Sequence, residues 1–183
     1  MYSPLSMQRH QTAVPIAPLT ETWYVVCQHA FARSVTAARI ITDFFQRYER
    51  IYGVDFGIRI YAAGLFDGNG SDIGPGSRLA THFFNFTGLS KPYLLTQEKA
   101  DAATRLFSMT QDISDRLITG FNQPREKITC LDLPHAGLAF VLPGTPFLVG
   151  TLEQKLLPNL SDYAFQRIEA AKKQREDSLV VRV

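Results

Sequence analysis

Cysteine and histidine, the residues that most often hold metals, are scarce in this chain. It contains two cysteines and four histidines among 183 residues. Cys27 and Cys130 lie far apart in apolar surroundings, and no two histidines share the spacing of metal ligands. We therefore expect no metal site and no cofactor, and we expect both cysteines to be buried, reduced thiols.

Long apolar runs and a strong excess of charge are also lacking. No run approaches the roughly 20 apolar residues that a membrane-spanning helix needs. The first residues lack the charged start and apolar core of a secretory signal. Lysine and arginine (19) nearly balance aspartate and glutamate (17), so the net charge of +2 does not by itself indicate an acidic partner. These features predict a cytoplasmic protein without a membrane partner.

Short catalytic motifs are missing as well. There is no Gly-x-Ser-x-Gly elbow, and no base adjoins either cysteine. His82 stands among aromatic residues and His135 in an expected loop. Pairing either histidine with a distant aspartate would build an acid–base site, but the spacing does not predict such a pair. The sequence therefore leans away from an enzyme.

What the chain has is an ordinary globular composition, with 45% hydrophobic and 20% charged residues. We expect a single globular domain over residues 19–177. Residues 1–18 carry three prolines and no acidic residue, which predicts a flexible arm. Residues 178–183, "SLVVRV", follow a charged stretch and predict a C-terminal strand or tail.

A heptad-spaced stripe of mostly apolar, aromatic and small residues is the strongest pattern. Its members are Trp23, Cys27, Ala30, Ser34, Ala37, Ile41, Phe44, Tyr48 and Ile51. Alternating steps of four and three place them on one side of a single helix over about 20–52, with Thr20 as N-cap and Gly53 after its end. The stripe predicts a packing seam, within the domain or against a second copy, centred on Trp23, Cys27, Ile41, Phe44 and Tyr48.

The start of this segment leaves an alternative open. "TWYVVC" is rich in aromatic and β-branched residues, which favour strands. If packing decides for a strand, the segment divides into a strand at 22–27 and a helix at 34–52. We favour the continuous helix.

The remaining elements predict an α+β fold. Alternating apolar residues predict a strand over 54–66, and the residues from Thr96 to Gly120 predict one helix. Further strands are expected at 127–133 and on both sides of a Pro-Gly turn near 143, and a last helix opens at Asn159 or Ser161. Together these form three main helices, one of them long, packed on a small and mostly antiparallel sheet.

The glycine-rich loop 67–78 is the first candidate for a ligand site. Its spacing partly resembles a calcium loop and partly a phosphate loop, but neither pattern is complete. An exposed, mobile loop explains the composition better than either ligand site. The residues of a weak ligand or phosphate loop would be Asp67, Gly68, Asn69, Gly70, Ser71, Asp72 and Arg78.

Basic residues on the expected long helix are the second candidate. Arg39, Arg47 and Arg50 would form a weak basic face, interleaved with Asp43 and Glu49. Interleaved charges are typical of a solvated helix, whereas nucleic acid prefers an unbroken positive stripe.

The sequence therefore favours a non-enzymatic cytoplasmic module for protein–protein interaction or assembly, with a protein partner or self-association into an oligomer. Two alternatives remain open. One is a nucleic-acid-associated accessory protein. The other is an enzyme with its site at loop 67–78.

Overall fold

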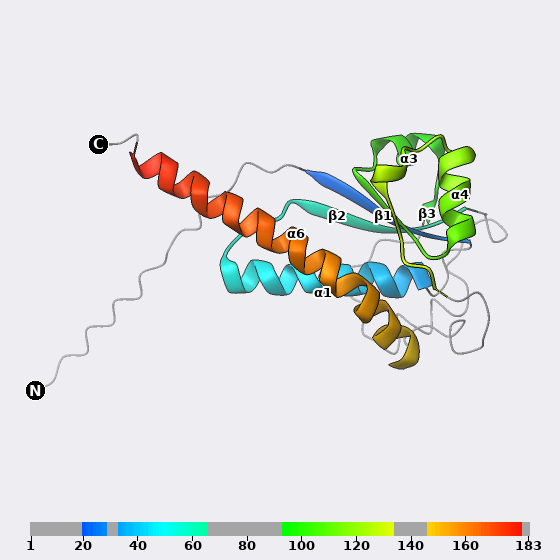
Figure 1. Ribbon diagram of the computed structural model, residues 1–183, viewed down its shortest axis with the longest axis horizontal. Helices are drawn as coiled ribbons and strands as arrows, with labels where there is room; N and C mark the ends of the chain where they lie inside the picture. Colours follow the sequence, from blue (N-terminus) through cyan, green and yellow to red (C-terminus); the bar gives the residue numbers. More distant parts are fainter. Residues whose placement is uncertain (1–19, 29–32, 66–92, 134–145, 181–183) are drawn as a thin grey trace, which may run out of the picture.

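The computed structural model describes residues 20–28, 33–65, 93–133 and 146–180. These residues form one sheet with helices on both of its faces (Figure 1). The expected arm 1–18, the glycine-rich loop 67–78 and the expected Pro-Gly turn lie outside the described residues. Among the described residues, no helix is long and apolar enough to cross a membrane.

The sheet is parallel throughout. Its strands are β1 (Glu21–Cys27), β2 (Ile58–Gly64), β3 (Tyr93–Leu94), β4 (Arg105–Ser108) and β5 (Ile128–Cys130). They lie in the order β3-β2-β1-β4-β5, and every neighbouring pair is parallel. The expected α+β fold with a mostly antiparallel sheet is therefore wrong. Consecutive strands are joined by crossovers rather than hairpins, and such crossovers return the chain in the same direction.

Helices cover both faces of this sheet, as in doubly wound α/β folds. They are α1 (Arg33–Tyr52), α3 (Gln97–Ala102), α4 (Gln111–Thr119) and α6 (Pro146–Val180), with a 3-10 turn η1 (Arg125–Lys127). Side chains of α1 and α6 pack with Trp23, Val25 and Cys27 on one face. Side chains of α3 and α4 pack with Tyr24 and Val26 on the other.

The segment expected as one helix over 20–52 divides into β1 and α1, so the alternative of a strand followed by a helix is the correct one. Trp23 and Cys27 are four positions apart, which satisfies the period of a strand as well as that of a helix. Packing decides between them, because residues 23–27 are all buried between two helical layers. A central parallel strand is apolar on both faces and shows no alternation in sequence.

The end of α1 lies where the sequence predicts it. The helix stops at Tyr52, and Gly53 follows with a positive φ of 62°. The Gly53 amide donates to the Glu49 carbonyl at 2.9 Å, as in a helix C-terminus that ends in the left-handed conformation. The expected strand 54–66 is shorter, because β2 begins only at Ile58.

The helix expected between Thr96 and Gly120 is also divided. Thr96 caps α3, accepting a hydrogen bond from the Lys99 amide at 3.3 Å, and Gly120 follows α4 as predicted. Between the two helices lies β4, whose Leu106 and Phe107 are buried on opposite faces of the sheet. The helical spacing of Leu106 with Ala102 and Ile113 in the sequence is therefore coincidental.

The last helix is longer than expected. It begins at Pro146, where proline is favoured in the first helical turn, and runs 35 residues to Val180. The second strand expected after the Pro-Gly turn is therefore helical, and α6 also includes residues 178–180 of the expected strand or tail. One apolar stripe packs α6 onto the sheet, formed by Leu148, Leu152, Leu156, Leu160, Ala164, Ile168 and Ala171.

Trp23 joins the sheet to both helices on its face. Its ring centroid lies 5.4 Å from that of Phe45 on α1 and 5.0 Å from that of Tyr163 on α6. The indole Nε1 donates to the Glu21 carboxylate at 2.8 Å, and the Tyr163 hydroxyl donates to the same carboxylate. The Arg105 guanidinium lies over both the Trp23 and Tyr163 rings. One carboxylate therefore fixes α6 to the first residue of β1.

Replacing Tyr163 should change how the free energy of unfolding depends on pH. Burial first, and then the Glu21 carboxylate, raise the pKa of Tyr163 above its ordinary value of 10.0. Folding therefore favours the protonated phenol, and the stabilisation is complete below pH 10.0 and is lost as the pH rises above it. We expect the unfolding free energy to fall with rising alkaline pH less steeply in Tyr163→Phe, and to be about 1–2 kcal/mol lower at neutral pH.

Chemical denaturation at a series of pH values measures both effects. Tyr24, whose pKa is also raised by burial, remains in both proteins, so only the difference between them reports Tyr163. Identical pH slopes for the two proteins would contradict this account.

Candidate functional site

The carboxyl end of β1 is the point where the chain reverses its direction of travel across the sheet. After β1 it proceeds to β2 and β3 on one side, and it returns to β4 and β5 on the other. In open parallel sheets such a switch point leaves a crevice at the carboxyl ends of the strands, where ligands bind. The residue at this point is Cys27.

Cys27 is held against the first turn of α1. Its side chain is 4% exposed, and its Sγ lies 3.1 Å from the Oγ of Ser34, which is fully buried. A hydroxyl this close can donate to a thiolate. The amino end of α1 adds a positive partial charge close to the sulfur. The thiolate is the nucleophilic form of cysteine, and a hydroxyl donor and a helix amino end are groups that can contact a bound anion beside it.

The first turn of α1 also holds two buried polar atoms without a hydrogen-bond partner among the described residues. They are Nη1 of Arg33 and Oγ1 of Thr36. Buried donors are almost always satisfied in folded proteins, so an orphaned guanidinium nitrogen indicates a missing acceptor. Arg33 precedes Ser34 directly, and an anion beside Cys27 would supply that acceptor.

The connection between β1 and α1 is short. Five residues separate Cys27 from Arg33, and of these the structure describes only Gln28. A short loop that leads from a parallel strand into a helix places the helix amide groups near the strand end. The Cys27 thiol therefore lies against the amino end of α1, where Arg33 and Ser34 are the first two residues of the helix. This combination can bind a tetrahedral anion and attack it.

Two carboxylates follow strands at the same edge of the sheet. Asp132 comes two residues after β5, is exposed, and adopts a positive φ of 46°. Asp112 lies in the first turn of α4, and its carboxylate accepts a hydrogen bond from the Thr110 hydroxyl. The backbone on both sides of Asp132 is fixed, because Leu131 and Leu133 donate to the Ser108 and Met109 carbonyls at 2.8 and 2.7 Å.

The structure places the predicted seam residues on two elements. Trp23 and Cys27 belong to β1, whereas Ile41, Phe44 and Tyr48 belong to α1. All five pack in one apolar cluster, with Phe44 and Tyr48 only partly buried. Cys27, predicted as an inert core thiol, lies at the candidate site.

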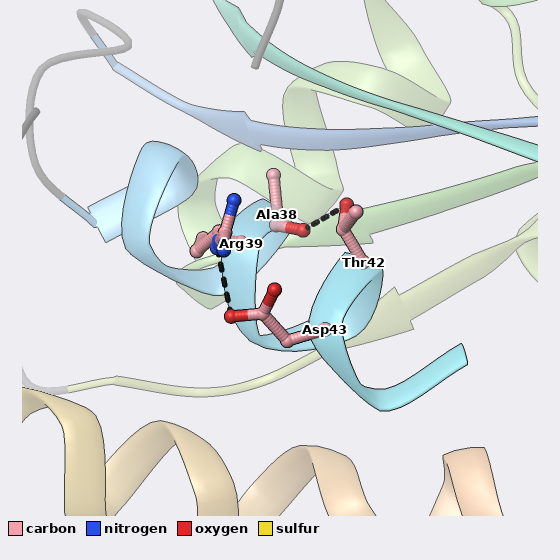
Figure 2. A network of polar contacts seen from close by, with 4 residues as sticks. All are labelled: Ala38, Arg39, Thr42 and Asp43. Atoms are coloured by element: carbon pink, nitrogen blue, oxygen red, sulfur yellow. Dashed lines mark hydrogen bonds and ion pairs between the residues drawn. The ribbon is translucent and has the colours of Figure 1, made fainter. Parts of the chain in front are cut away.

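The predicted basic residues all lie on α1. Arg39 and Arg47 line a groove between α1 and α6, whereas Arg50 lies beside Gln46 and Glu49. The Arg39 Nε donates to the Asp43 carboxylate at 2.7 Å, one helical turn away (Figure 2). The Arg50 Nε donates to the Gln46 carbonyl at 3.1 Å.

The residues of the predicted glycine-rich ligand loop, 67–78, lie outside the described residues. Among the residues that the structure describes, no group of three metal-ligating side chains comes together.

Sequence reasoning placed Ser34 in the packing stripe and considered Asp132 only as a possible partner of a histidine, and it did not associate Arg33 with Cys27. The available signal was a cysteine that ends an apolar strand, with an Arg-Ser pair opening a helix after five further residues. This pattern can be recognised only when residues 22–27 are assigned to a strand. A continuous helix would place Cys27 and Ser34 two turns apart on a packing face.

No protein-family model and no curated protein sequence matches this chain. Solved structures do resemble it. A low molecular weight protein tyrosine phosphatase from Bacillus subtilis is 18% identical with a TM-score of 0.58, covering 77% of this chain and 97% of that chain. The YwlE arginine phosphatase from Geobacillus stearothermophilus is 20% identical with a TM-score of 0.50, covering 87% of this chain and 96% of that chain.

A third similar structure is a YwlE arginine phosphatase with a cysteine-to-serine substitution and a phosphorylated active-site serine. It is 17% identical with a TM-score of 0.50, covering 85% of this chain and 98% of that chain. At these identities the three similarities establish a shared fold.

This fold corrects the expected function. The structural neighbours are phosphatases, so the expectation of a non-enzymatic interaction module or accessory protein is wrong, as is the leaning away from an enzyme. The open alternative of an enzyme agrees better with these neighbours. The error arose because Cys27 was assigned to one long helix, in which its contact with Ser34 across a strand–helix junction cannot be recognised.

The orphaned Arg33 predicts phosphate binding independently of any catalysis. Inorganic phosphate should raise the melting temperature of the wild-type protein, since a ligand present at about a hundred times its Kd adds about 2.7 kcal/mol to the unfolding free energy. Arg33→Ala should abolish this rise. Arg47→Ala, which removes an arginine farther along the same helix, is the matched control and should retain it.

Differential scanning fluorimetry across a phosphate titration measures the rise. A phosphate-dependent rise that persists in Arg33→Ala, or that disappears equally in Arg47→Ala, would exclude the proposed role of Arg33.

Proposed function

We propose that this protein is a cysteine-dependent phosphatase that removes phosphoryl groups from protein side chains. The observation that carries the proposal is the position of Cys27, buried at the switch point and 3.1 Å from Ser34 at the start of α1. Arg33 supports it with a buried nitrogen that has no acceptor among the described residues. The likeness to tyrosine and arginine phosphatases supports it through the fold.

In the first step, the Cys27 thiolate attacks the phosphorus atom of the bound phosphoryl group. A sulfur–phosphorus bond forms, and the bond from phosphorus to the leaving oxygen or nitrogen breaks with its electron pair remaining on the leaving atom. In the second step, water attacks phosphorus, the sulfur–phosphorus bond breaks, and inorganic phosphate and the thiolate are released. The phosphorylated active-site serine of one structural neighbour supports an intermediate at this position.

Arg33 and the amino end of α1 hold the phosphoryl oxygens during both steps. A guanidinium can donate two parallel hydrogen bonds to a phosphoryl group, which fixes its orientation as well as its charge. Preorganised donors of this kind stabilise the charge that spreads over the oxygens in the transition state. Ser34 stabilises the thiolate both before attack and as it leaves in the second step.

Asp132 is the proposed proton donor to the leaving group. It is an exposed carboxyl group at the edge of the sheet where Cys27 lies, and its backbone is fixed by hydrogen bonds on both sides. After protonating the leaving atom, the same carboxylate can accept a proton from the attacking water, which returns it to its starting state.

The substrate is a phosphorylated tyrosine or arginine side chain, the two types named for the structural neighbours. A panel of phosphotyrosine and phosphoarginine peptides distinguishes them. The cytoplasmic location expected from the sequence stays a prediction.

Substitution of Cys27 tests the nucleophile. The wild-type protein should hydrolyse para-nitrophenyl phosphate, and Cys27→Ser should be inactive because serine is a much weaker nucleophile at neutral pH. Cys130→Ser is the matched control and should retain activity. Ser34→Ala should lower kcat by about 10–100-fold, the loss expected for a single stabilising hydrogen bond.

Wild-type-like circular dichroism in the variants makes their activities comparable. Hydrolysis by Cys27→Ser at the wild-type rate would refute the proposed mechanism. So would a folded wild-type protein that releases no phosphate from para-nitrophenyl phosphate or from either peptide.

Substitution of Asp132 tests the proton donor through the leaving group. Asp132→Asn should lower kcat for phenyl phosphate by about 10²–10⁴-fold, the usual contribution of a positioned acid. The loss should be much smaller for para-nitrophenyl phosphate, whose leaving group is stable without a proton. Equal losses for the two substrates would assign the acid to another residue, and Asp112→Asn is the matched control at the same edge.

A further inference from the structure

A groove of about 470 Å³ runs between α1 and α6, and Cys27 is not among the residues that line it. Its apolar walls come from both helices: Ile40, Phe44 and Tyr48 from α1, and Val149 and Leu157 from α6. Both elements are long helices that pack on the sheet through other faces. The groove is therefore a permanent feature of this helix pair.

The groove continues at one end into exposed apolar side chains. On α1, the aromatic rings of Phe44, Tyr48 and Tyr52 form a ladder with centroid separations of 4.4 and 5.5 Å. Beside them Ile51 is 64% exposed and Tyr52 46% exposed. On α6, Phe165 follows the groove residue Ser161 by one turn and is also 64% exposed. One half of this surface is hollow and the other half projects.

The groove also carries two carboxylates and two guanidinium groups. The hollow half carries the carboxylates of Asp43 and Glu153, and the Arg39 guanidinium already pairs with Asp43 (Figure 2). Glu153 has no hydrogen-bond or ion-pair partner among the described residues. Towards the projecting half lies Arg47, which is exposed and likewise has no partner among the described residues.

We propose that this surface joins two copies of the chain in a two-fold symmetric dimer. A two-fold axis across the middle of the groove sets the helix pairs antiparallel, so that the projecting half of each copy faces the hollow half of the other. Phe165, Ile51 and Tyr52 of one copy then fill the groove of its partner. Arg47 of each copy faces the half of its partner that carries the two carboxylates.

Such a surface is self-complementary, as a closed two-fold interface requires. Exposed apolar side chains that lie together with a groove are typical of interaction sites, whereas scattered ones need no explanation. In the proposed dimer the exposed apolar side chains of one copy meet the groove of the other, and Arg47 of one copy meets Glu153 of the other, which makes a second copy of this chain the proposed occupant. The dimer leaves the Cys27 site open and does not depend on the proposed phosphatase activity.

Sedimentation equilibrium over a concentration series tests the proposal. The full wild-type chain should sediment as a dimer that dissociates on dilution, and Phe165→Asp should be monomeric because it places a charge in the apolar contact. Phe147→Asp is the matched control: Phe147 is 58% exposed on the same helix but does not line the groove, so this variant should remain dimeric. Because both side chains are exposed, both variants should fold.

Charge reversal tests the orientation of the two copies. Arg47→Glu should weaken the dimer at least tenfold, and adding Glu153→Arg should recover most of that loss. A wild-type chain that stays monomeric up to about 100 μM would overturn the proposal and leave the groove to a smaller ligand or another protein. Dimers of Phe165→Asp as tight as those of the wild type would overturn it as well.

Discussion

The packing around Trp23 is the constraint on which the rest of the structure depends. Its ring is fully buried and contacts α1 through Phe45, β4 through Phe107 and α6 through Tyr163. Aromatic pairs of this geometry contribute beyond the area that they bury. The indole N–H requires a partner, which Glu21 supplies at the start of the same strand. Trp23 therefore holds β1 against the helices and fixes the positions of α1 and α6 on one face of the sheet.

This constraint also determines where the chemistry occurs. From Trp23 to Cys27 the strand is buried on both faces, so the thiol emerges at one fixed place at the end of the central strand. The helix that begins six residues later is itself held by Phe45 against Trp23. Cys27, Arg33 and Ser34 thus have their relative positions set by the core. The loop between Cys27 and Arg33 therefore need contribute little to these relative positions.

Local signals in the sequence predicted boundaries better than they predicted topology. Thr96 marks a helix start through its capping hydroxyl, and Gly53 and Gly120 follow helix ends, as the sequence predicts. The identity of β1 and β4 depended on contacts with distant strands, and the four-residue spacing of Trp23 and Cys27 fitted either structure. The parallel pairing could not be predicted either, since the sequence of one strand does not indicate the direction of its neighbour. The site was missed for the same reason, because Cys27 and Ser34 meet only across a strand–helix junction.

The register of the sheet has a consequence for the redox behaviour of Cys27. The other cysteine, Cys130, pairs with Ser108, which in turn pairs with Val26. The two cysteines thus stand two strands apart, about 9–10 Å between backbones, beyond the roughly 7 Å that a disulfide can span. A Cys27 thiolate oxidised to sulfenic acid has no resolving thiol on this sheet. Its reduction through a disulfide would therefore need a thiol from another molecule, and further oxidant would take it to sulfinic and sulfonic acid.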